Sequence, residues 1–236
     1  MATIELEVRE VRSETSTIRS IRLDLAGRAF PFKPGQYCLV QLPGLPEGDD
    51  RPLSMAGAPS RHETLVFATR ESQSAYKKAF FRLKAGDRVT VTGPTGRFVY
   101  DGALPSTVFL SGGIGITPIK SMIEYAVDRQ LNNRMVLLFG NRLPADIPFR
   151  RELDDLGRAA PNLKVVHVVS DPGPSGWTGE IGRIDEALIK RKVGDPQGAH
   201  YYICGPPGMV AGLRETLARI AIPKEQVHIE NFEGYE

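Results

Sequence analysis

The sequence is poor in cysteine, with Cys38 and Cys204 as the two cysteines among 236 residues. Two distant cysteines cannot supply the four ligands of an iron–sulfur cluster, and they do not resemble the paired ligands of a zinc site. We therefore expect no metal site. Low cysteine usage is also typical of a reducing compartment, so we expect a cytoplasmic protein.

The sequence also lacks a strong charge bias and a long apolar run near its start. Its net charge of +2 is too small to favour nucleic-acid binding. Residues 1–5 alternate between polar and apolar side chains, which predicts neither a signal peptide nor a membrane span. The longest basic cluster, Lys190-Arg191-Lys192, lies at the end of a predicted helix, where cations offset the helix dipole. A docking patch for an acidic partner protein stays open there.

The sequence changes character near residue 102. Before this point, short runs such as Ile4–Val8 and Val89–Thr92 alternate between polar and apolar residues, and turns such as Pro34-Gly35 separate them. This period of two predicts antiparallel strands with one buried face. Many short strands with a single helix among them, at about residues 75–83, indicate a closed barrel or a sandwich.

After residue 102 the apolar runs become continuous, as in Thr107–Leu110 and Met135–Phe139. Helical segments separate these runs, and we place them near residues 118–130, 149–159, 183–191 and 207–221. Strands buried on both faces that alternate with helices predict a parallel sheet covered on both sides. We therefore expect two domains, a barrel or sandwich of antiparallel strands at 1–102 and a doubly wound α/β domain at 103–236.

The segment Ser111-Gly112-Gly113-Ile114-Gly115-Ile116-Thr117-Pro118 directly follows the first strand of the second half. Its glycines let the backbone approach a ligand closely. Thr117 is expected to cap the next helix, and Pro118 suits the first turn. Free N–H groups at a helix start favour an anion such as a pyrophosphate. The spacing differs from G-x-G-x-x-G, so a turn whose glycines only pack strand against helix stays open.

A second motif, Cys204-Gly205-Pro206-Pro207-Gly208-Met209, again lies between a strand and a helix. Its prolines restrict the path of the turn, and its glycines allow a flat ring to lie close to the backbone. Cys204 would then face the crevice with a small, polarizable side chain. The alternative is a buried core cysteine followed by a turn.

The third motif is Arg51-Pro52-Leu53-Ser54 on a predicted barrel strand. Arg51 offers a fork of donors that suits a phosphate, and Ser54 adds a hydroxyl on the same strand. From these residues alone, a surface arginine and a strand-end serine are an equally good interpretation.

These motifs occur in one order, in a barrel followed by an α/β domain, and in this the chain strongly resembles the ferredoxin–NADP reductase superfamily over essentially its whole length. In that family R-x-[YF]-S binds the flavin, G-G-x-G-x-T/A-P binds the dinucleotide, and C-G-P-P-x-M lies under the nicotinamide. The resemblance implies an antiparallel Greek-key barrel that binds FAD and an α/β domain that binds NAD(P)H. It implies an NAD(P)H-dependent flavoprotein reductase that transfers a hydride to FAD.

The resemblance also implies roles for single residues around the flavin. Arg51 would hold the flavin pyrophosphate, and Ser54 would form a hydrogen bond near flavin N5. Leu53 replaces the aromatic residue that usually stacks on the ring, which implies weaker flavin retention. The remaining flavin contacts that it implies come from Pro52, Thr69, Arg70, Ser74, Phe232 and Tyr235. Ser74 is also expected to cap the helix that follows it.

Around the dinucleotide, the resemblance places the pyrophosphate at Gly112–Pro118 and the nicotinamide between Cys204 and the flavin. The nicotinamide turn would include Gly205, Pro206 and Met209. Glu230 is implied to act with Ser54 and Cys204 in the reaction. Asn141 and Arg142 follow the strand that ends at Phe139, and their side chains suit either a 2′-phosphate or a free ribose hydroxyl.

Asp171 follows the next strand, where a carboxylate would repel a 2′-phosphate. We therefore expect NADH rather than NADPH as the donor. No iron–sulfur domain is present in the sequence, so we expect a separate acceptor protein such as ferredoxin, flavodoxin or an oxygenase component. The alternatives are a flavin reductase that uses flavin as a substrate and a non-autonomous electron-transfer subunit of a larger complex.

Overall fold

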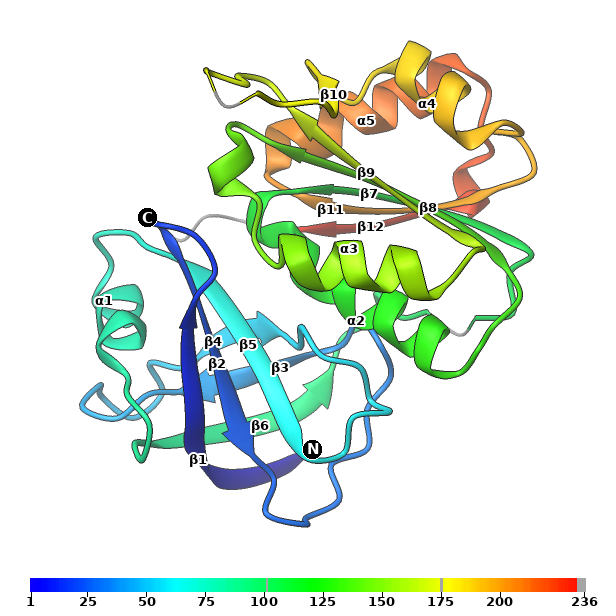
Figure 1. Cartoon of the computed structure of the whole chain (residues 1–236). Coiled ribbons are helices and arrows are strands. Elements are labelled where there is room, and N and C mark those ends of the chain that lie inside the picture. Colours follow the sequence, from blue (N-terminus) through cyan, green and yellow to red (C-terminus); the bar gives the residue numbers. More distant parts are fainter. Residues whose placement is uncertain (101, 175, 233–236) are drawn as a thin grey trace.

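The protein is described from a computed structural model that covers residues 1–100, 102–174 and 176–232. It contains two six-stranded sheets, one antiparallel and one parallel (Figure 1). The antiparallel sheet has the order β4-β3-β6-β1-β2-β5. Its strands are β1 (Ala2–Ser13), β2 (Ile18–Asp24), β3 (Tyr37–Gln41), β4 (Arg51–Ser54), β5 (Thr64–Arg70) and β6 (Arg88–Thr95).

The antiparallel sheet forms because its strands bury alternate side chains. In β1, Leu6 and Val8 are buried while Glu5 and Glu7 are exposed. The sheet curls into a nearly closed barrel, and the chain just past β4 meets β5, where the Ala56 N–H donates to Val66 O at 2.8 Å. Helix α1 (Ala75–Arg82) lies between β5 and β6 in the chain and contributes Tyr76 and Phe80 to the barrel core.

The parallel sheet has the order β10-β9-β8-β7-β11-β12, so the chain starts in the middle at β7 and extends first to one side and then to the other. Its strands are β7 (Ser106–Gly112), β8 (Arg134–Asn141), β9 (Leu163–Val169), β10 (Glu180–Ile181), β11 (His200–Gly205) and β12 (Val227–Asn231). Open α/β sheets bind ligands outside the carboxyl ends of the strands where the order reverses, which here is between β7 and β11.

Helices cover both faces of the parallel sheet, which is why its strands are apolar throughout. Helices α2 (Ile116–Asp128) and α3 (Arg150–Ala159) cover the face toward the barrel, whereas α4 (Glu186–Val193) and α5 (Pro207–Arg219) cover the other face (Figure 1). None of the helices in the described ranges is long and apolar enough to cross a membrane.

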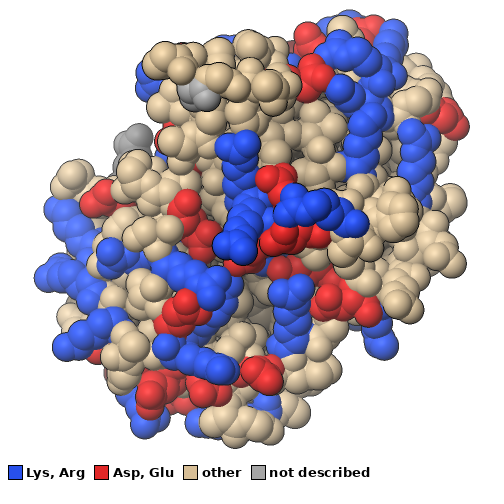
Figure 2. All heavy atoms as spheres, in the orientation of Figure 1, with Lys and Arg blue, Asp and Glu red and all other residues tan. Residues whose placement is uncertain are grey.

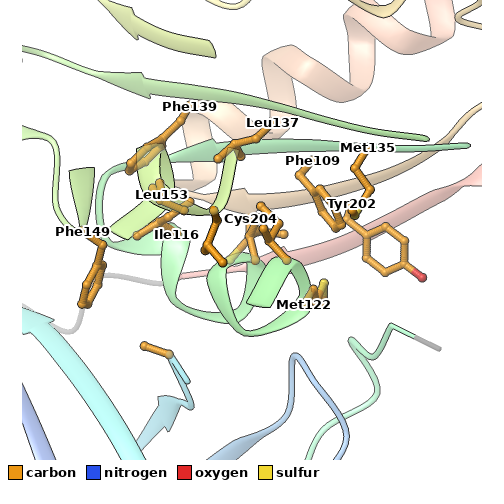
Figure 3. Close-up of a cluster of buried hydrophobic side chains, with 14 of the residues drawn as sticks. Phe109, Ile116, Met122, Met135, Leu137, Phe139, Phe149, Leu153, Tyr202 and Cys204 are labelled. Atoms are coloured by element: carbon orange, nitrogen blue, oxygen red, sulfur yellow. The ribbon is translucent and has the colours of Figure 1, made fainter. Parts of the chain in front are cut away.

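The two halves meet along α2 and α3. On the surface of this junction, basic and acidic side chains lie next to one another (Figure 2). Beneath it, one hydrophobic cluster contains Phe109 and Ile116 from the parallel-sheet half together with Ala56 and Ala68 from the barrel. Figure 3 labels members of this cluster from the parallel-sheet half, including Phe109 and Ile116. The barrel and the parallel sheet therefore share a continuous core.

The structure confirms the predicted barrel followed by a doubly wound sheet, and it corrects the start of one helix. Helix α2 begins at Ile116 after a short 3₁₀ helix, Gly113–Gly115, and Gly115 is its N-cap. Thr117 is therefore not the helix cap. Because helical geometry is established before Thr117, its hydroxyl donates back to Ile114 O at 3.1 Å. The division into domains at residue 102 stays a prediction.

Candidate functional site

The two glycine-containing motifs of the parallel-sheet half lie side by side at the carboxyl ends of β7 and β11. The strands pair in parallel with Ser111 opposite Cys204, so the turns that follow both strands leave the same edge of the sheet. A methyl group added to Gly115 would lie 2.5 Å from the Cys204 carbonyl oxygen. Gly115 therefore allows the backbones of the two turns to touch, and this part of the loop does pack strand against helix.

The first glycine turn also reaches the barrel. Gly113 has a φ of +54°, a conformation that favours glycine, and a methyl group there would lie 3.3 Å from Nη2 of Arg70. Arg70 ends β5, and its Nη1 donates to Thr17 Oγ1 at 3.2 Å. Arg70, predicted to contact the flavin, and Gly113, predicted to contact the dinucleotide, are thus neighbours, although they belong to different halves of the chain.

The carboxyl end of β8 carries an unsatisfied amide. Both carboxamide atoms of Asn141 are buried, and neither has a hydrogen-bond partner among the described residues. Buried polar atoms without partners are costly, so they point to a ligand that supplies the missing hydrogen bonds. The next residue, Arg142, is exposed, and its carbonyl oxygen accepts from the Asp171 N–H at 2.9 Å. Arg142 and Asp171, the two charged candidates for selecting between NADH and NADPH, therefore lie next to each other.

The predicted flavin phosphate site places a cation between an aromatic ring and a carboxylate. Arg51 lies over the ring of Tyr76 at 5.8 Å, and its Nη2 is 2.5 Å from Oδ1 of Asp49. The Arg51 side chain is 36% exposed, so it is open to a ligand. Ser74 caps α1 as predicted, accepting from the Lys77 N–H at 3.3 Å.

The rest of the β4 motif becomes more buried toward the end of the strand. Pro52 is exposed, Leu53 is half-buried against the barrel core, and Ser54 is 7% exposed at the end of the strand. Ser54 pairs with Tyr37 of β3. Thr69, predicted as a further flavin contact, is buried beside Arg70 at the end of β5.

Cys204 does not face an open crevice, which corrects the expectation from the sequence. Its side chain is 0% exposed because both faces of the sheet are covered, and it belongs to the same hydrophobic cluster as Ile116. Burial, followed by the nearby charge of Glu230, raises the pKa of the Cys204 thiol well above its ordinary value. The thiol therefore stays protonated and packs as a small apolar side chain in the core.

The last described residues lie beside the turn that follows Cys204. Glu230 pairs with Cys204 in the register of β11 and β12, and burial raises the pKa of its carboxyl group. The Phe232 N–H donates to Gly205 O at 3.2 Å, which holds the chain beside the cysteine motif. Tyr235, predicted to cover the flavin, lies outside the described residues.

The remaining members of the cysteine motif begin the last long helix. Pro206 is the N-cap residue of α5, and Met209 lies in its first turn. The Met209 sulfur lies against Gly112, where an added methyl group would meet it. Pro118 lies in the first turn of α2, as predicted.

A cavity of about 520 Å³ separates the barrel from β12, lined on one side by Tyr37 and residues 95–99 and on the other by residues 228–231. Glu230 therefore lines the same cavity as Tyr37, the residue of β3 that pairs with Ser54. Sequence reasoning missed Tyr37 and His228 as lining residues. Their own patterns are those of ordinary strands, and only the meeting of the two sheets places them together.

Comparison with known proteins agrees with this architecture. Residues 109–215 match the family described as the oxidoreductase NAD-binding domain. The chain is 33% identical to ferredoxin–NADP reductase B of Sorangium cellulosum, over 94% of this chain and 95% of that protein. It is 34% identical to the ferredoxin–NAD(P)(+) reductase component of the naphthalene 1,2-dioxygenase/salicylate 5-hydroxylase systems of Ralstonia sp., over 95% of this chain and 67% of that protein.

Solved structures show the same fold. The ferredoxin reductase in carbazole 1,9a-dioxygenase superposes with a TM-score of 0.84 at 28% identity, covering 98% of this chain and 70% of that one. A ferredoxin NADP+ reductase from Neisseria gonorrhoeae with bound FAD and NADP superposes with a TM-score of 0.82 at 21% identity, covering 98% of this chain and 99% of that one. The second likeness bears on the fold alone.

Proposed function

The chain belongs to the ferredoxin–NADP reductase superfamily, and from this premise we propose that Arg51, Ser54 and the two glycine turns hold FAD and a nicotinamide dinucleotide against each other. The protein is a flavin-dependent NAD(P)H oxidoreductase that passes electrons to a separate acceptor. The observation that carries the proposed site is the closeness of Arg70 to Gly113, where an added methyl group would lie 3.3 Å from Nη2 of Arg70, because a barrel side chain thereby reaches the glycine turn.

The residues of the barrel fit FAD. Arg51 presents a half-exposed guanidinium group, and the start of α1 presents backbone N–H groups beside Ser74, so both ends of a pyrophosphate find donors. FAD, when bound, accepts a hydride from a reduced nicotinamide and releases its electrons to an acceptor. In our proposal Ser54 donates or accepts a hydrogen bond at the reacting edge of the flavin ring.

The parallel sheet fits the dinucleotide. In our proposal the backbone N–H groups of Gly113–Gly115, the 3₁₀ turn that leads into α2, bind the pyrophosphate. The buried carboxamide of Asn141 lacks partners that a bound ribose would supply. We propose NADH as the preferred donor because the exposed Asp171 lies beside Arg142 and opposes a 2′-phosphate.

The turn that follows Cys204 is proposed to form the floor of the nicotinamide site, and Glu230 its proton-holding group. The buried, protonated thiol places no charge beneath this floor, and the raised pKa of Glu230 keeps a larger share of its carboxyl group protonated. Positioning by such residues is the main contribution of the protein, because the cofactors carry the hydride chemistry.

The proposed acceptor is a separate electron-transfer protein of the ferredoxin class or an oxygenase component. The supporting relatives are reductase components of propane 2-monooxygenase of Mycolicibacterium smegmatis and of naphthalene 1,2-dioxygenase/salicylate 5-hydroxylase systems of Ralstonia sp.. A cytoplasmic location stays a prediction.

The test is an anaerobic titration of the purified protein with NADH and then with NADPH. Bleaching of bound FAD at a lower concentration of NADH would support the site and the donor preference. Bleaching by NADPH alone would overturn the donor preference, and bound flavin that neither donor reduces would overturn the hydride function.

A second candidate function, reduction of flavin as a dissociable substrate, is supported by the pairing of Arg51 with Asp49 and by the aliphatic Leu53. Both features lower the affinity for flavin relative to a free arginine and a stacked aromatic ring. A colourless purified protein that reduces added flavin with NADH would favour this candidate over a tightly bound FAD.

A further inference from the structure

A lysine is buried at the junction of the barrel and the parallel-sheet half. Lys120 lies in the second turn of α2 and is 1% exposed. Its ammonium group forms ion pairs with Glu124, one turn further along α2, and with Oε2 of Glu152 of α3 at 2.8 Å. It also lies 5.1 Å from the centre of the Phe149 ring. Lysine is rarely buried to this degree unless it is paired.

The same face of α2 binds the backbone of the loop that follows β4. Lys120 Nζ donates to Ala56 O at 3.1 Å, and Ser121 Oγ donates to Gly57 O at 2.8 Å. The Ala58 N–H in turn donates to Oε2 of Glu124 at 3.0 Å. Consecutive peptide groups of the loop are thus held by side chains of one helix.

Further charges surround this contact from the barrel side. Arg22 of β2 pairs with Oε1 of Glu152 at 3.0 Å, and Arg61 pairs with Oε1 of Glu124 at 3.4 Å. Arg12 of β1 lies 3.5 Å from Oε1 of Glu152. The buried lysine therefore has its carboxylate partners fixed in turn by cations of the barrel.

The position of this network in the chain gives it a functional meaning. The loop Ala56–Ala58 begins two residues after Ser54, the residue proposed to contact the reacting edge of the flavin. Helix α2 begins at the glycine turn proposed to hold the dinucleotide pyrophosphate. The network therefore ties the flavin side of the site to the dinucleotide side through one short, rigid path.

We propose that Lys120 is a positioning residue for hydride transfer, which sets the spacing between the nicotinamide and the flavin by holding the loop after Ser54 against α2. This inference rests on the proposed function of Ser54 and the glycine turn. Buried ion pairs contribute little net stability compared with apolar packing of the same volume, so a geometric role explains the network better than stabilisation does.

Geometry of this kind has a large effect on rate. A displacement of about 1 Å at the reacting atoms costs on the order of 100-fold in rate. Removing the ammonium group frees the Ala56 carbonyl and leaves two carboxylates close together, so the loop and the helix move apart. We expect binding of either cofactor alone to change little, because neither Arg51 nor the glycine turn is touched.

The experiment compares the FAD-loaded wild type with Lys120→Met and Lys120→Arg in stopped-flow reduction by NADH. Lys120→Met is expected to lower the limiting rate of flavin reduction about tenfold or more, with the affinity for FAD and the apparent dissociation constant for NADH within about twofold. The long-wavelength charge-transfer absorbance between nicotinamide and flavin is expected to weaken in parallel. Lys120→Arg, which keeps the cation, is expected to restore most of the limiting rate and most of the charge-transfer absorbance.

Lys190→Met is the matched control, since it removes an exposed lysine that pairs with Glu186 four residues away in α4. It is expected to leave the rate and the absorbance band unchanged. If Lys120→Met does not fold, Ser121→Ala removes only the hydrogen bond to Gly57 and decides the question with a smaller loss of rate and of absorbance.

A lower melting temperature with an unchanged limiting rate and an unchanged absorbance band would overturn the positioning role. The same holds if Lys120→Arg fails to recover the rate although its fold is intact. A wild-type protein whose bound flavin neither donor reduces would instead overturn the proposed function, so the two failures are distinguishable.

Discussion

Cys204 and Glu230 are partners in the register of the parallel strands β11 and β12, and the charge of Glu230 adds to burial in raising the pKa of the Cys204 thiol. Partners in a parallel register point to the same face of the sheet. A buried thiol thus lies next to a half-buried carboxyl group that lines the cavity at the junction of the two sheets, and burial raises the pKa of both groups.

The first prediction concerns stability and pH at Glu230. Its pKa is raised from the ordinary value of 4.5, so the protonated form is favoured by the fold. Its contribution to stability is fully present below that ordinary value and is lost as the pH rises through the raised pKa. We expect the melting temperature of Glu230→Gln, measured relative to the wild type, to increase between pH 4 and pH 8.

The control for this pH series is Glu225→Gln, which removes an exposed carboxylate a few residues earlier in the chain. A difference between Glu230→Gln and the wild type that stays constant across the pH series would contradict the prediction, and so would one that matches the control.

The second prediction concerns the contact between the two glycine turns. Gly115→Ala places a methyl group 2.5 Å from the Cys204 carbonyl oxygen, where only backbone movement can relieve the clash. We expect a loss of about 1–3 kcal/mol in the free energy of unfolding, typical of overpacking, together with weaker dinucleotide binding. Chemical denaturation and NADH titration measure the two effects.

Gly212→Ala is the matched control for Gly115→Ala. An added methyl group at Gly212 meets nothing within 4 Å, and the residue lies within α5, outside the two glycine-containing motifs. Alanine there is expected to be neutral or slightly stabilising, since it favours the helix. Equal losses in the two variants would show that the clash is not the cause.

The third prediction concerns Asp49, which occupies a donor of Arg51 that the flavin pyrophosphate would use. Asp49→Asn removes this competing charge and also its repulsion of the phosphate. We expect the affinity of the apoprotein for FAD to rise by a factor of about 1.4 to 5, which corresponds to the roughly 0.2–1 kcal/mol of exposed ion pairs. Isothermal titration calorimetry with FAD measures the change.

Glu47→Gln serves as the control for Asp49→Asn, because Glu47 is an exposed carboxylate of the same loop. A similar gain in both variants would mean that the general charge of the loop, rather than the contact with Arg51, sets the affinity. A decrease with Asp49→Asn would mean that Asp49 holds Arg51 in its binding position.

The fourth prediction concerns Leu53, which is half-buried between the exposed Pro52 and the buried Ser54. An aromatic ring at this position would stack on the flavin and add roughly 0.5–1.5 kcal/mol beyond its buried area. We expect Leu53→Tyr to slow the release of FAD by about two- to tenfold. The release rate is followed by flavin fluorescence after dilution, and an unchanged rate would place Leu53 away from the ring.

Much of the fold could be predicted from local patterns. The alternation in Ile4–Val8 predicted a strand with one buried face, and Leu6 and Val8 are buried in the barrel. The continuous run Thr107–Leu110 predicted a strand covered on both sides, as observed. Ser74 was predicted as a helix cap because a serine hydroxyl suits that position whatever the tertiary context.

Other features could not be predicted because they depend on neighbours distant in the sequence. The contact of Arg70 with Gly113, the burial of Lys120 against Ala56, and the cavity between Tyr37 and Glu230 all arise where the two sheets meet. Thr117 was wrongly predicted as the helix cap for a different reason. The 3₁₀ turn Gly113–Gly115 begins helical geometry earlier in the chain, so that Gly115 takes the N-cap position.

The sequence by itself determined the two classes of sheet, their order along the chain, and the motifs of the proposed flavin and dinucleotide sites. These depend on side-chain periodicity and on the conformations that glycine and proline allow, which are local properties. Only the tertiary structure decided which charges are buried, which partner each cation takes, and how the flavin side meets the dinucleotide side. Those outcomes follow from packing between the halves, where burial makes each unpaired charge costly.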